Sequence, residues 1–199
     1  MRPHEPDAPN KRVLHPGDFQ VAPHPAVLST LLGSCVAVCL YDPQKPFIGM
    51  NHFLLATRRA VKNVPPLESE AGRYGIHAME LLITALLARG CARHRLRAKA
   101  FGGGNVLGHR SGEPHALSNI GAVNASFVQD FLATDGIPLV AADLGGNIGR
   151  QIHFVSDDYS VYVRPIPSAQ SAHLVNEERH HWHQRVEAEA SAQSKTHFW

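Results

Sequence analysis

Two kinds of segment follow one another along the chain, and their order restricts the fold more than any other feature of the sequence. Short apolar runs rich in β-branched residues, bounded by Gly, Pro or Asp, predict strands. Two longer segments, 71–89 and 118–134, instead repeat their apolar residues at helical spacing. Strands and hairpins thus surround only two helices, without a regular βαβ alternation. This order predicts an α+β layered fold with a mostly antiparallel or mixed sheet.

The predicted strands fall before, between and after the two helices. Before them, the chain is extended over 19–28 with breaks at Pro23 and Pro25, and a loop over the first part of 29–41 runs into a buried strand. The segment 46–55 predicts a second strand, paired with that one as a hairpin. The remaining predicted strands are 96–101, then 137–144 and 150–156 as a hairpin around Gly145-Gly146-Asn147, and finally 159–165.

Length and composition indicate one domain with tails. The 199 residues are too few for two full-sized domains, and a hydrophobic content of 44% excludes wholesale disorder. We predict a flexible N-terminal arm over 1–12, a domain over 13–167 and a flexible His-rich tail over 168–199, with a marginal helix over 177–193 as the alternative. No carboxylate or Cys spacing completes a metal site around the tail histidines, so no metal is expected.

Charge and hydropathy narrow the class of protein further. Lys and Arg number 19 against 17 Asp and Glu, a balance that argues against nucleic-acid binding. No apolar run approaches the roughly 18 residues that a membrane span needs. The N-terminus has no apolar stretch behind its charges, which predicts no signal peptide and hence a cytoplasmic protein.

The three cysteines, Cys35, Cys39 and Cys91, are too few for a disulfide framework. Cys35 and Cys39 lie four residues apart in one predicted strand, which separates them by about 13 Å. A disulfide needs Cα atoms within about 7 Å of each other, so this pair is excluded. We expect free thiols, with structural roles for Cys39 and Cys91.

The Gly-rich stretch over 102–108 reads GGGNVLG and suggests a phosphate-binding loop at first sight. The GxGxxG pattern fails at Leu107, however, and no Gly-Lys-Ser/Thr sequence follows. The stretch is therefore better explained as a tight turn in which two backbone segments approach closely.

The sharpest candidate for chemistry is the sequence Leu32-Gly33-Ser34-Cys35. Gly33 permits a turn that presents the thiol and backbone N–H groups together, as a thiolate nucleophile with an oxyanion site requires. His52 lies in the predicted partner strand, and the hairpin can bring it beside Cys35 to accept the thiol proton. From these residues alone, a core cysteine and a locally bonded histidine are the open alternatives.

The sequence around these residues resembles the CheD family of chemoreceptor glutamine deamidases. The segments that carry the resemblance are STLLGSCVAVCLYD at 29–42 and GMNHFLL at 49–55. Further matches follow in the expected order, namely RYG at 73–75, KAFGGGN at 99–105 and DLGGNIGR at 143–150. The resemblance covers roughly residues 12–165.

The resemblance implies a cysteine hydrolase, a protein-glutamine glutaminase that converts selected glutamines of methyl-accepting chemotaxis receptors to glutamate and so supports adaptation. It implies the sandwich fold of the cytotoxic necrotizing factor deamidases, with Cys35 as nucleophile and His52 as base. The family's third residue is a threonine six positions before the cysteine; Ser29 stands there, and Thr30 could replace it after a small shift. No cofactor is expected, and we expect backbone N–H groups near Gly33 and Ser34 to stabilise the oxyanion.

A second reading follows from the same resemblance. Members of the family also resemble partners of CheC-type phosphatases, which act on the phosphorylated response regulator. The chain could therefore be a regulatory binding module with little catalysis. The Cys35–His52 pair argues against a complete loss of chemistry. The expected partners are chemotaxis receptors and a CheC-type phosphatase, and the same machinery could in principle cleave a glutamyl methyl ester.

Overall fold

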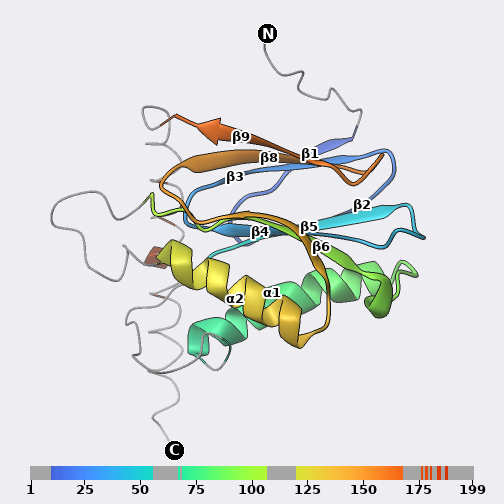
Figure 1. Cartoon of the computed structure of the whole chain (residues 1–199), viewed down its shortest axis with the longest axis horizontal. Coiled ribbons are helices and arrows are strands. Elements are labelled where there is room, and N and C mark those ends of the chain that lie inside the picture. Colours follow the sequence, from blue (N-terminus) through green and yellow to red (C-terminus); the bar gives the residue numbers. More distant parts are fainter. Residues whose placement is uncertain are drawn as a thin grey trace, which may run out of the picture.

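Three layers make up the protein in the computed structural model, which describes residues 10–55, 67, 69–106, 120–167, 176, 178, 180, 183, 184 and 187. A four-stranded sheet lies on a five-stranded sheet, and two long helices cover the other face of the five-stranded sheet (Figure 1). This arrangement confirms the predicted α+β sandwich.

The four-stranded sheet has the order β1-β3-β8-β9. Only its β1–β3 pair is parallel. Its strands are β1 (Lys11–Val13), β3 (Val27–Leu32), β8 (Gly149–Val155) and β9 (Val161–Ile166). The segment 29–32, predicted as part of a loop, thus belongs to β3. That prediction was wrong because Gly33 and Ser34, and not the serine and threonine before them, form the turn.

The five-stranded sheet has the order β2-β5-β4-β6-β7, and only its β6–β7 pair is parallel. Its strands are β2 (Phe19–Pro23), β4 (Val36–Tyr41), β5 (Phe47–Phe53), β6 (Arg97–Gly102) and β7 (Leu139–Leu144). The predicted hairpin between the strands now labelled β4 and β5 is confirmed.

The hairpin predicted between the strands now labelled β7 and β8 is wrong. β7 pairs with β6 in the five-stranded sheet, whereas β8 pairs with β3 and β9 in the other sheet. Gly145 and Gly146, both with positive φ (81° and 75°), turn the chain from one sheet into the other. A glycine-rich turn adopts such φ values at little cost, so the same residues serve a crossing as readily as a hairpin.

The two long helices, α1 (Glu70–Leu87) and α2 (Ile120–Thr134), confirm the predicted helices. The Ser69 side chain caps α1 by accepting a hydrogen bond from the backbone N–H of Gly72 at 2.9 Å. Beyond its end, Gly90 has a φ of 82°, as the sequence predicts for a residue that stops a helix. A single 3-10 turn, Arg93–Arg95, then leads into β6.

Side chains alternate along β4 and β5, so that some pack in the core between the two sheets and the others in the core beneath the helices. Ala37, Cys39 and Met50 face the other sheet, whereas Val38 and Phe53 pack in the cluster beneath the helices. His52 has the same parity as Met50, so it lies between the two sheets rather than under the helices. All three cysteines are free, as predicted, and all three are buried.

An ion pair between the buried Asp42 and the partly exposed Arg95 ties the end of β4 to the turn before β6. The Asp42 carboxylate accepts hydrogen bonds from the backbone N–H groups of Gln44 and Ala92, both at 3.0 Å, and from the Arg95 guanidinium at 2.8 Å. Burial alone would raise the pKa of Asp42, but these donors outweigh it and lower the pKa to about 2.

We expect this carboxylate to make stability depend on pH in the acid range. Because its pKa is lower in the folded state than the ordinary value of 3.8, its contribution is complete above that value and disappears as the pH falls towards about 2. Asp42→Asn should lower the free energy of unfolding by about 2 kcal/mol at pH 7. Urea unfolding at pH 7 and at pH 3 measures this, and an equal deficit at both values would contradict the assignment.

Candidate active site

Cys35 lies in the short turn that carries the chain from β3 in one sheet to β4 in the other, and it is fully buried. Each backbone carbonyl of residues 33–35 accepts a hydrogen bond from another segment. Gly103 N donates to Cys35 O and Gly104 N donates to Gly33 O, both at 2.7 Å. The carbonyl of Ser34 accepts from the Asn124 side chain, also at 2.7 Å. The orientation of the turn is therefore fixed by its neighbours.

The Gly-rich stretch supplies this support, and the predicted close backbone approach is confirmed. Gly102 has a φ of 105°, and a Cβ added to it would lie 2.2 Å from the carbonyl oxygen of Cys35. No side chain fits there. The role of these glycines is thus to let β6 and the following residues lie directly against the turn that holds the nucleophile.

Asn124 is a site residue that the sequence analysis did not identify. It is fully buried in α2; its Nδ2 donates to Ser34 O, and its Oδ1 accepts from the Leu55 N–H at 2.9 Å. It therefore connects the Cys35 turn with the end of β5. The sequence does contain an indication of this role. Asn124 lies four residues after Ile120 and three before Phe127, so a polar side chain falls on the apolar face of the predicted helix.

His52 lies on β5 with 2% of its surface exposed, and its Nδ1 is 2.8 Å from Thr30 Oγ1 on β3. The Thr30 hydroxyl donates its single hydrogen to the carbonyl of Leu14, also at 2.8 Å. Towards His52 the hydroxyl can then act only as an acceptor, which assigns the proton of the neutral imidazole to Nδ1. Nε2 is left as the basic nitrogen of the ring.

Ser29, the other candidate for the third residue, points elsewhere. Its hydroxyl donates to the backbone carbonyl of Ile152 at 3.0 Å. Neighbouring residues of a strand alternate between its two faces, and Thr30 shares the parity of Leu28 and Leu32, which lie in the core between the sheets. The structure thus brings Thr30, and not Ser29, to the imidazole.

Glu178, from the C-terminal segment, occupies the space in front of the Cys35 turn and is fully buried. Its Oε1 accepts from the backbone N–H groups of Gly33 at 2.7 Å and Cys35 at 3.1 Å. Its Oε2 accepts from both the backbone N–H and the hydroxyl of Ser34, each at 2.7 Å. The backbone N–H groups of residues 33–35 therefore all donate to one carboxylate, while the carbonyls of the same three residues accept hydrogen bonds from residues 103, 104 and 124.

Sγ of Cys35, a ring nitrogen of His52 and a carboxylate oxygen of Glu178 all lie within 4.8 Å of one another. Burial raises the pKa of the Cys35 thiol well above its ordinary value, and the charge of Glu178 and a hydrogen bond to its carboxylate raise it further. With Glu178 in place, Cys35 is a neutral thiol. The exposed sulfur expected from the sequence is not seen in this arrangement.

Cys, His and Glu are also ligand types for zinc. Here, however, each oxygen of Glu178 already accepts two hydrogen bonds. The carboxylate therefore sits as an anion in a pocket of donors. The expectation that the protein needs no metal stays a prediction.

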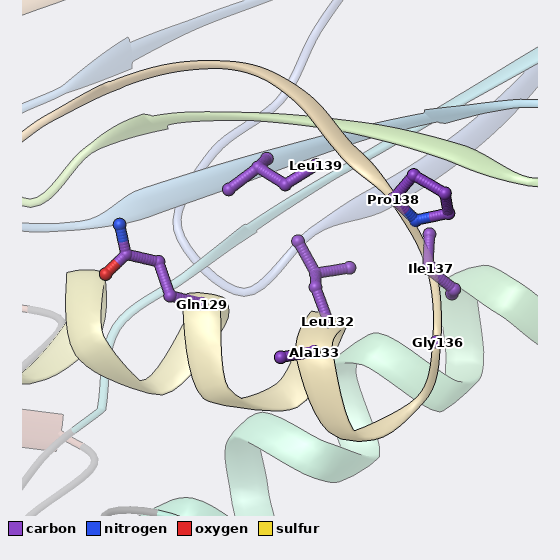
Figure 2. A pocket seen from close by; sticks show the side chains of 7 residues that line it. All are labelled: Gln129, Leu132, Ala133, Gly136, Ile137, Pro138 and Leu139. Carbon is purple, nitrogen blue, oxygen red and sulfur yellow. The ribbon is translucent and has the colours of Figure 1, made fainter.

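The hollow drawn in Figure 2 lies at the other end of α2 and has a volume of about 320 Å³. Its lining consists of Gln129, Leu132, Ala133, Gly136, Ile137, Pro138 and Leu139. None of these side chains is a nucleophile or an acid–base group, so the chemistry is assigned to the Cys35 turn.

In the described parts of the chain, no helix is both long and apolar enough to cross a membrane.

Comparison with known proteins adds an independent line of argument. The family model CheD, described as CheD chemotactic sensory transduction, matches residues 55–165. A relative from Geobacter sulfurreducens named "Probable chemoreceptor glutamine deamidase CheD 1" is 47% identical over 92% of this chain and 91% of its own length. A relative from Shewanella oneidensis named "Probable chemoreceptor glutamine deamidase CheD 2" is 50% identical over 75% of this chain and 74% of its own length.

Among solved structures, the hypothetical protein YfiH from Bacillus licheniformis is similar with a TM-score of 0.39 and 15% identity, over 63% of this chain and 50% of that one. This similarity is too low to support a functional statement. The family model covers more than half of the chain, and close relatives extend the match along nearly all of it. The chain therefore belongs to the CheD family.

Proposed function

We propose that this protein is a protein-glutamine deamidase that converts chosen glutamine side chains of chemotaxis receptors to glutamate, with release of ammonia. The observation that carries the proposal is the meeting of three groups at one buried point. These are the Cys35 thiol, the His52 imidazole and the N–H groups of residues 33–35. The relatives are named as chemoreceptor glutamine deamidases, which supports receptors as the substrate.

The first half of the proposed reaction forms a thioester. Nε2 of His52 accepts the proton of the Cys35 thiol, and the sulfur attacks the side-chain carbonyl carbon of the glutamine. Negative charge develops on the carbonyl oxygen, where the N–H groups of the Cys35 turn donate to it. The protonated imidazole then gives its proton to the departing nitrogen, which leaves as ammonia.

The second half hydrolyses the thioester. A water molecule gives a proton to His52 as it attacks the same carbon, and the bond to sulfur breaks. The products are a glutamate side chain and the regenerated thiol, and only water is consumed. A glutamyl methyl ester would pass through the same acyl-enzyme, with methanol as the leaving group.

Intact mass spectrometry of a receptor cytoplasmic fragment tests the proposal. The fragment is incubated with the wild type and with Cys35→Ala. We expect a gain of about 1 Da per modified glutamine with the wild type only. No gain with either protein, on receptors from its own cell, would reject the enzymatic function.

Binding to a CheC-type phosphatase and a cytoplasmic location stay predictions from the sequence. The binding alternative is separable, because Cys35→Ala should keep its affinity for such a partner while it loses deamidation. An unmodified receptor together with tight phosphatase binding would favour the regulatory module.

Thr30 is proposed as the residue that orients the His52 imidazole. Thr30→Val removes the hydroxyl at nearly constant volume, and loss of one such hydrogen bond should lower kcat by about tenfold. Thr30→Ser should restore most of the rate. Ser29→Ala is the matched control in the same strand and should stay close to the wild type.

The pH profile of kcat separates orientation from a general packing defect. Thr30→Val should shift the apparent pKa assigned to His52, because the acceptor that fixes Nδ1–H is gone. A larger loss in Ser29→Ala than in Thr30→Val would assign the role to Ser29 instead.

A further inference from the structure

The side chain in the proposed site is chemically the product of the proposed reaction. Deamidation of glutamine yields a glutamate side chain, and Glu178 carries that side chain. Its carboxylate meets the donors of Gly33, Ser34 and Cys35 where the oxygen of a bound substrate would have to lie. One of its oxygens also lies within 4.8 Å of the Cys35 Sγ and of a ring nitrogen of His52. The Cys35 thiol and the His52 imidazole thus both lie close to the carboxylate of Glu178.

The setting of Glu178 in the C-terminal segment points the same way. Each of the six described residues there is helical, and five of them are exposed, namely Asn176, His180, His183, Gln184 and Glu187. Glu178 alone among these six is buried, with no exposed surface. A helical backbone therefore delivers one acidic side chain into the pocket while its described neighbours stay in solvent.

Burial of a carboxylate is costly unless its oxygens are fully hydrogen-bonded. Here the four donors all belong to the turn before and at the nucleophile. The pocket holds the anion with the same donors that the reaction needs, so occupancy by Glu178 and by a substrate exclude each other.

We propose that the segment around Glu178 is an intramolecular product analogue, which binds the active site as a glutamate of a receptor would and must leave before a substrate glutamine can enter. The inference rests on the proposed deamidase function and adds a regulated state to it. Receptors compete with the protein's own tail. The effective concentration of a tethered ligand is typically in the millimolar range, so this competition is substantial.

The first test converts the bound product into a substrate. In Glu178→Gln, the amide should be attacked by Cys35, lose ammonia and be hydrolysed, so that position 178 becomes glutamate again. The peptide that carries this position should then have the wild-type mass. In Cys35→Ala/Glu178→Gln it should stay about 1 Da lighter. Glu187→Gln, an exposed position of the same segment, is the matched control and should keep its amide.

The second test follows the reaction on a receptor fragment. Glu178→Ala should raise kcat/KM by about tenfold through a lower KM, with kcat unchanged, because a competing ligand reduces the fraction of binding-competent protein. Glu187→Ala should behave as the wild type. Equal kinetics for Glu178→Ala and the wild type would overturn the proposal.

The outcomes separate this inference from the function on which it rests. If receptor fragments are deamidated while position 178 keeps its amide in Glu178→Gln, the proposed deamidase function is supported and the product-analogue proposal is rejected. If neither is deamidated, the proposed function itself fails. Conversion of Cys35→Ala/Glu178→Gln by added wild-type protein would place the contact between molecules and overturn its intramolecular character.

Discussion

Cys35→Ala and His52→Ala should each reduce the rate of receptor deamidation by at least about 10⁴-fold, and the double variant should lose no more than either single one. The two side chains act on the same proton, so removing one disables the other. Burial raises the pKa of the Cys35 thiol, which therefore supplies almost no thiolate without a base. Quantitative mass spectrometry of a receptor fragment over time measures the loss.

Cys39→Ala is the matched control for this prediction. Cys39 is equally buried and lies four residues along, on β4, with Ala37 and Met50 in the core between the sheets. Its replacement should leave the rate within a few fold of the wild type. Multiplicative losses in the Cys35 and His52 double variant would show that the two residues act independently and would contradict the proposed pair.

Gly102→Ala should lower the free energy of unfolding by about 3 to 4 kcal/mol, the sum of backbone strain and a steric overlap. The new Cβ would lie 2.2 Å from the Cys35 carbonyl oxygen, in a residue whose φ is 105°. Relief requires movement of the nucleophile turn, because that oxygen also accepts from Gly103 N. Deamidation should therefore fall as well, even at temperatures where the variant is folded.

Gly136→Ala is the control that isolates the strain. Gly136 has a φ of 69°, and nothing lies within 4 Å of an added Cβ. This variant should lose only about 1 kcal/mol, the cost of a left-handed residue with a side chain, and keep its activity. Urea unfolding of both variants gives the comparison, and equal losses would show that contact with the Cys35 turn adds nothing.

Much of this molecule is readable from its sequence, because local patterns determine it. The helical spacing of Met79, Ile83 and Leu86 predicts α1, and the apolar run over 46–55 predicts β5 and its pairing with β4. The sequence also places Cys35 beside a turn and His52 in the neighbouring hairpin strand. These features depend on contacts between residues that are close along the chain.

The remainder depends on contacts between distant segments. Whether Ser29 or Thr30 reaches His52 is decided by the parity of β3, and a segment 29–32 that is predicted as a loop has no parity to use. The separation of β7 from β8 reflects the parallel pairing of β7 with β6, for which the sequence between Leu144 and Gly149 contains no marker. A polar tail likewise contains no local sign that Glu178 is buried.

The placement of the three catalytic candidates in different parts of the sandwich has a consequence for folding. Thr30 belongs to one sheet, His52 to the other, and Cys35 to the turn that joins them. A chain in which only one sheet has formed holds an ordinary thiol and an unoriented imidazole. The pairing of nucleophile and base therefore requires both sheets, and an incompletely folded chain should not deamidate.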